Sequence, residues 1–159
     1  MTKEGYNMLQ ILLGAGVLSA LIAGLISFRL QNNFFKEQTK RLQEKEEQDN
    51  LKKAEFIKKA FLHESNYNIL LAEKANAMQQ RIEQYFDTQC YSLFKENIAL
   101  LGDELAESIN NLYIELFSAN SQIKTLNYAQ VNYLSIKPVY ENQKQKLEKF
   151  VTFLKTKLK

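Results

Sequence analysis

The first apolar stretch of the chain covers residues 8–28 and contains no charged side chain. A helix rises about 1.5 Å per residue, so this stretch reaches roughly 31 Å, the thickness of the hydrocarbon core of a bilayer. A soluble helix of this length normally has a polar face, and this one has none. The pattern predicts a single transmembrane helix at 8–28, preceded by a short extracytoplasmic tail at 1–7.

A cleavable signal peptide is the competing interpretation of this stretch. Signal peptides have a basic start, an apolar run of about 7–15 residues and a small-residue cleavage site. Here the run is longer, and Lys3 is offset by Glu4. Basic residues favour the cytoplasmic side of a membrane. Four of them follow the run closely: Arg29, Lys36, Lys40 and Arg41. We therefore expect a single-pass protein of the inner (cytoplasmic) cell membrane, with its N-terminus outside and its C-terminal domain in the cytoplasm.

Small residues recur every four positions inside the apolar stretch, at Gly16, Ala20 and Gly24. Such a face lets two membrane helices approach closely, so it indicates transmembrane packing, either with a second copy or with another membrane protein. The simpler explanation is that Gly and Ala are common in membrane helices.

Charged and amide side chains dominate the next segment, residues 29–55. Its composition is rich in Glu, Lys, Gln and Arg, which are good helix formers. Pairs such as Glu37 and Arg41 have the favourable i,i+4 order. We expect a charged helical stalk that continues from the membrane helix. A disordered charged linker is the alternative.

From residue 56 onward, apolar positions recur at steps of three and four, which is the seam spacing of a helical bundle or coiled coil. We expect helices at about 56–88, with a break near 63–68 capped by Ser65 or Asn66, and at 90–119, with Gly102 as a weak spot inside one helix. The predicted bundle seam consists of Leu71, Met78, Ile82, Ile98, Leu101, Leu105 and Leu112.

A last amphipathic helix is predicted at 138–158, because proline is tolerated at the first helical position and Pro138 stands there. Residues 120–137 are ambiguous and fit a helix end followed by a connector. The fold class is therefore all-α, with an antiparallel helical bundle or coiled coil in a cytoplasmic domain at 56–159.

Charge is segregated along the chain: the net charge is +3 over 29–60, −5 over 61–110 and +5 over 111–159. The acidic middle and the basic tail fit two parts of one bundle. The basic C-terminal helix also fits a surface of anionic lipid. Nucleic-acid binding is disfavoured because there is no recognised motif and the basic surface is modest.

Candidate chemistry is sparse, since the chain has 1 Cys and 1 His. In a single helix over 63–90, His63 and Cys90 would lie about 40 Å apart, so only a break near residue 65 would bring them together. We expect Cys90 to be a core residue and His63 a surface or capping residue. We assign no catalytic, cofactor-binding or metal-binding residue.

Two functions fit these features. The first is a membrane-anchored helical scaffold or adaptor that acts by protein–protein interaction and is not an enzyme. The second is a small toxin-like or defence-associated membrane protein that self-assembles through its transmembrane helix and perturbs the bilayer.

Overall fold

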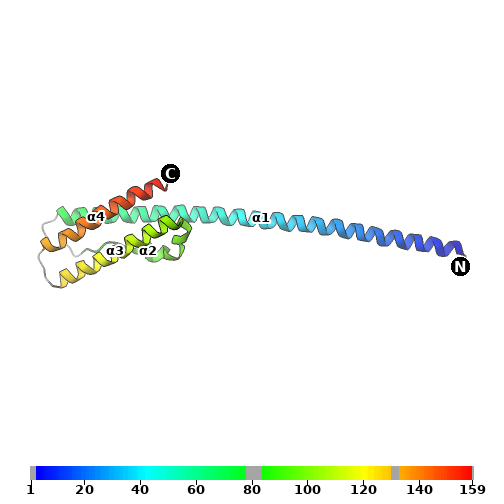
Figure 1. The fold of residues 1–159 in the computed structure, drawn as a ribbon, viewed down its shortest axis with the longest axis horizontal. Helices are drawn as coiled ribbons and strands as arrows, with labels where there is room; N and C mark the ends of the chain where they lie inside the picture. The colour runs from blue at the N-terminus through cyan, green and yellow to red at the C-terminus, as the bar shows by residue number, and fades with distance from the viewer. Residues whose placement is uncertain (1–2, 78–83, 130–132, 159) are drawn as a thin grey trace. The chain divides into compact units, whose positions relative to one another are not determined.

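The structure, a computed structural model, describes residues 3–77, 84–129 and 133–158, and the side chains of 14–77, 84–129 and 135–158. Every regular element within these residues is helical (Figure 1), so the prediction of an all-α fold is confirmed. The elements are α1 (Lys3–Ala77), α2 (Gln89–Phe94), the 3₁₀ helix η1 (Lys95–Leu101), α3 (Asp103–Tyr128) and α4 (Tyr133–Thr156).

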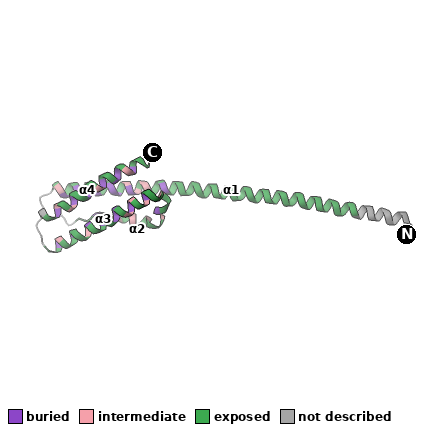
Figure 2. Cartoon of the chain, in the orientation of Figure 1, coloured by how far each residue is buried: buried purple, intermediate pink, exposed green. Residues whose placement is uncertain are grey.

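The chain divides into two compact units, Met1–Gln48 and Asp49–Lys159, here called the N-terminal and C-terminal units. The N-terminal unit is a single stretch of α1, and its described side chains are all exposed (Figure 2). Its charged part is helical throughout and is therefore not a disordered linker. An ion pair of the expected type forms there, with Arg41 Nη2 lying 2.7 Å from Glu37 Oε1.

The core of the C-terminal unit lies between the last part of α1, α3 and α4. Lys58 Nζ on α1 donates to the carbonyl of Lys157, the residue after α4, at 3.1 Å, and Lys144 on α4 lies 3.0 Å from Glu73 on α1. These pairs make α1 and α4 antiparallel. In contrast, α3 runs in the same direction as α1 (Figure 1). The expected antiparallel arrangement therefore holds for α3 and α4, whose ion pairs Lys146–Glu115 and Lys157–Glu104 run in opposite directions, but not for α1 and α3.

The expected helix over 56–88 is wrong in two respects. No break occurs at 63–68, where α1 is continuous, and α1 ends at Ala77 rather than near residue 88. Residues 84–88 are not helical; we call them the connector. We expected a helix break there because Ser and Asn are weak helix formers. In the structure, Ser65 and Asn68 are buried in the bundle, and this burial overrides their low helix propensity.

The expected single helix over 90–119 is also wrong. Gly102 has φ +84° and ψ 155°, a backbone conformation that side chains with a Cβ rarely adopt and that no helix contains. The chain therefore turns at Gly102 between η1 and α3. α3 then continues to Tyr128, well beyond the expected end.

The last helix begins earlier than expected, at Tyr133, so Pro138 lies inside α4 rather than at its first position. A proline there removes one backbone hydrogen bond of the helix. The helix persists because one of its faces is almost fully buried, with exposures of 1% or less at Ile136, Tyr140, Leu147 and Leu154.

Most residues of the predicted seam lie in the core. Leu71, Ile98, Leu105 and Leu112 are buried, and the partly buried Leu101 packs against them. Met78 and Ile82 lie outside the described residues.

Candidate functional site

A continuous apolar surface covers the described first part of α1. Ten large apolar side chains between Val17 and Phe35 are each 54–64% exposed. At roughly 100 Å² apiece they amount to about 1,000 Å², which exceeds the largest apolar patch of a typical soluble monomer, about 300–600 Å². A patch of this size is typical of surfaces that are covered by a partner or by lipid.

Among the described residues, one helix is long and apolar enough to cross a membrane, and its most apolar part has a mean hydropathy of 1.4 with none of it buried. By length and composition alone, a core helix of a soluble protein and a signal sequence share these properties. Gly16 and Gly24 are equally uncovered, since a Cβ placed at either would meet nothing within 4 Å.

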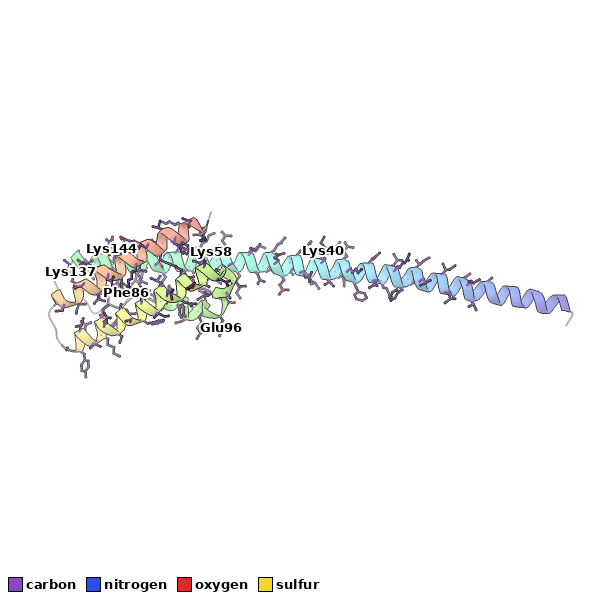
Figure 3. The ribbon with its side chains drawn as sticks, viewed as in Figure 1. Lys40, Lys58, Phe86, Glu96, Lys137 and Lys144 are labelled. Atoms are coloured by element: carbon purple, nitrogen blue, oxygen red, sulfur yellow. The ribbon has the colours of Figure 1, made fainter. Side chains whose placement is uncertain are left out.

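Two asparagines hold the connector in the C-terminal unit. Asn68 of α1 donates from Nδ2 to the carbonyl of Asp87 at 2.8 Å and accepts the Asp87 N–H at 2.7 Å. Asn120 of α3 makes the same pair of bonds with Phe86, at 2.9 and 2.8 Å. We call these two side chains the Asn clamp. Phe86, 2% exposed, lies among the helices of the bundle (Figure 3).

A buried carboxylate, Glu64, lies in the same unit, one to two helical turns from Asn68. Its Oε2 accepts the backbone N–H of Cys90 at 2.7 Å, and its Oε1 accepts the hydroxyl of Tyr113. The Tyr113 ring stacks on Tyr91 at 5.0 Å and meets Phe61 edge-on at 5.4 Å. Glu64 is 5% exposed, and these two donors stabilise its burial.

The titration of the neighbouring groups reflects this environment. Burial, followed by the nearby Glu64 carboxylate, raises the pKa of Cys90 to about 12. Burial and the hydrogen bond to Glu64 also raise the pKa of Tyr113. The Cys90 thiol is therefore protonated at neutral pH and is a weak nucleophile.

Cys90 lies beside α1 although α1 has no break near residue 65. Its neighbour there is Glu64. His63 is exposed on the same helix.

The basic α4 pairs with acidic residues of the other two core helices. Lys144 lies 3.0 Å from Glu73 of α1. Lys146 lies 3.0 Å from Glu115 and Lys157 lies 2.6 Å from Glu104, both on α3. Much of the charge segregation along the sequence is therefore compensated inside the C-terminal unit.

Sequence reasoning missed Glu64, Asn68 and Asn120. Asn68 lies in the segment 63–68, where we expected a helix break, and Asn120 begins the ambiguous segment 120–137. Both expectations arose because asparagine is a poor residue for a helix interior. A better signal is a polar residue at a position where helical spacing requires an apolar one, since such a side chain must bond to something buried.

In the described parts of the chain, no three His, Cys, Asp or Glu side chains come together as a potential metal site. The chain matches no protein family model, no curated protein sequence and no solved structure.

Proposed function

We propose that this protein is a single-pass membrane-anchored scaffold or adaptor, whose C-terminal unit binds a protein partner on the cytoplasmic side. The observation that carries the proposal is the uncovered apolar surface between Val17 and Phe35, joined in one chain to a well-packed helical unit.

The size of the apolar surface supports the anchor. Seven of the ten side chains lie within 8–28. Removing their roughly 700 Å² from water at about 25 cal/mol per Å² is favourable by roughly 18 kcal/mol, as an upper estimate. A gain of this size matches stable insertion into a bilayer. The backbone of an α-helix satisfies its own hydrogen bonds, which a span in lipid requires.

The orientation rests on the charges that flank the span. Lys3 is the one basic residue before it, while Arg29, Lys36 and Lys40 follow it closely. Acidic neighbours contribute little to this rule, so the presence of Glu37 leaves the expectation unchanged.

The surface we assign to the partner is the outer face of α3. Ile114 is 63% exposed, Phe117 45% and Tyr128 91%. Successive residues of a helix turn by about 100°, so these three share one face. Exposed aromatic and branched apolar side chains of this kind are typical anchors of protein interfaces.

Charge insertion tests the anchor. On the insertion scale each Leu, Ile, Phe or Val contributes about −0.3 to −0.6 kcal/mol and each central arginine costs about 2.5–3.5 kcal/mol, so two arginines outweigh the remaining apolar side chains. Leu18→Arg with Ile22→Arg should therefore release the full-length chain from carbonate-washed membranes. The matched control is Leu42→Arg with Leu51→Arg, on exposed positions of α1 beyond the apolar stretch, and should leave the chain in the membrane. Release of the unmodified chain by carbonate, or a mature N-terminus beyond Phe28, would contradict the proposal.

Cysteine labelling tests the orientation. In a Cys90→Ser background, an impermeant maleimide applied to intact cells should label Gly5→Cys and not Lys45→Cys. The opposite pattern would place the C-terminal unit outside.

The stripe of Gly16, Ala20 and Gly24 favours a second candidate, the self-assembling membrane-active protein, because no described residue lies within 4 Å of a Cβ placed at either glycine. Expression in cells with a dye that reports membrane leakage separates the two candidates. Self-assembly predicts leakage that Gly16→Ile with Gly24→Ile abolishes. The adaptor hypothesis predicts no membrane leakage. It also predicts that a benzophenone amino acid placed at Ile114 or Phe117 forms a photo-crosslinked adduct with a partner protein.

A further inference from the structure

Three exposed apolar side chains, one at the end of the predicted span and two beyond it, are seven residues apart on one helix. Phe28, Phe35 and Leu42 are 64%, 63% and 68% exposed. At about 100° per residue they fall within roughly 40° of one another. Asn33 and Lys40 lie on the opposite side of the same helix. Leu30 and Phe34 are exposed outside this stripe, at 64% and 59%. The segment 28–42 therefore has a narrow apolar face, made by Phe28, Phe35 and Leu42, that no described residue of the N-terminal unit covers.

We propose that this face binds the same face of a second copy of the chain, as a short parallel coiled coil in register. The proposal rests on the membrane anchor for its parallel arrangement, because two copies inserted in one direction present the same end of 28–42 to each other. Phe28, Phe35 and Leu42 then occupy the first apolar position of successive heptads.

The polar positions of the heptads fit self-pairing. Gln31 and Gln38 occupy the other core position, and a glutamine amide both donates and accepts, so each pairs with its copy across the axis. The flanking positions place Arg41 of one copy beside Glu46 of the other, five residues on, which is attractive in a parallel pair. The next core position is Lys45, where two like charges meet, so the core of the pair ends there and the flanking Arg41–Glu46 contact borders that end.

The small area buried between the two copies explains why their pairing depends on the membrane. With about 200 Å² for each side chain, the measured exposures of Phe28, Phe35 and Leu42 give roughly 400 Å² per chain and roughly 800 Å² for the pair. Stable interfaces in solution bury at least about 1,200 Å². Confinement of both copies to one bilayer raises their effective concentration and supplies the remainder.

Cysteine crosslinking in membranes of cells that express the full chain tests the proposal. In a Cys90→Ser background, single cysteines replace Phe35, Gln38 or Leu42 on the proposed interface. Matched cysteines replace Asn33 or Lys40 on the opposite face. Mild copper-phenanthroline oxidation should give disulfide-linked dimers at least fivefold more abundant for the interface positions. Gln38→Cys keeps all three apolar side chains, so a low yield there cannot be attributed to their loss.

The charge pair provides an independent test of register. Arg41→Glu should lower the dimer yield of the Gln38→Cys chain about two- to fivefold. Adding Glu46→Arg should restore it. Equal yields at all five cysteine positions, no dimer at any of them, or no restoration would overturn the pairing.

Carbonate extraction of the same samples separates this proposal from the anchor. Chains that stay in the membrane pellet without the expected pattern overturn the pairing alone. Chains that appear in the supernatant overturn the anchor. If those extracted chains still show the expected crosslinking pattern, the pairing is supported. If they do not show it, the pairing is overturned as well.

Discussion

Replacing Asn68 by alanine removes both hydrogen bonds that hold Asp87 of the connector. Asn68 is fully buried, and the bonds measure 2.8 and 2.7 Å. The matched control is Asn66→Ala. Asn66 is exposed, and its Nδ2 donates to the carbonyl of Leu62 one turn back on the same helix at 2.9 Å. Both variants truncate an asparagine to alanine, but of these two asparagines Asn68 bonds to the connector and Asn66 bonds to its own helix.

The magnitude follows from the count of bonds. Two hydrogen bonds at about 0.5–1 kcal/mol each, with about 1–2 kcal/mol for leaving the partly buried Asp87 N–H unpaired, give a loss of roughly 2–4 kcal/mol in unfolding free energy. For a domain of about 100 residues, a loss of 2 kcal/mol lowers the melting temperature by about 8 °C or more. Asn66→Ala should change the unfolding free energy by less than about 0.5 kcal/mol.

Thermal unfolding followed by tyrosine circular dichroism measures the loss, and hydrogen exchange locates it. The amides of Phe86 and Asp87 should exchange about 30-fold faster in Asn68→Ala, since about 1.4 kcal/mol corresponds to a factor of ten. Asn120→Ala should have a similar effect. The double variant should cost less than the sum, because the bonded residues are consecutive and one loss already frees the segment. Equal melting temperatures for Asn68→Ala and Asn66→Ala would refute the reasoning.

Four further results are expected. Gly102→Ala should cost about 1–3 kcal/mol in urea unfolding although nothing lies within 4 Å of the added Cβ, because φ +84° strains any residue with a Cβ; a neutral result would contradict this. Iodoacetamide at pH 8 should alkylate Cys90 at least about 100-fold more slowly in the folded than in the urea-unfolded chain. The raised pKa of the Cys90 thiol contributes stability that is fully present below pH 9.0 and is lost as the pH rises toward about 12, so Cys90→Ala should flatten that decline. Lys146→Glu should destabilise the C-terminal unit by less than about 1 kcal/mol, and Glu115→Lys in the same chain should reverse the loss.

The sequence alone was sufficient to predict an all-helical protein with a long N-terminal helix. Apolar spacing, helix propensity and the absence of Gly and Pro between residues 24 and 102 are local properties, and each acts within a few turns of helix. The uncovered apolar stretch and the stripe of Gly16, Ala20 and Gly24 follow from the order of residues in the same way.

Tertiary structure decided where α1 ends, in which direction α3 runs, and that Asn68 and Asn120 stay inside helices. These features depend on which distant groups are buried together. An asparagine favours a helix end when its amide must bond to its own backbone, but it is stable inside a helix when the amide bonds to the connector. The position of Glu64 beside Tyr113 has the same origin, since a buried carboxylate requires donors that only the folded chain brings to it.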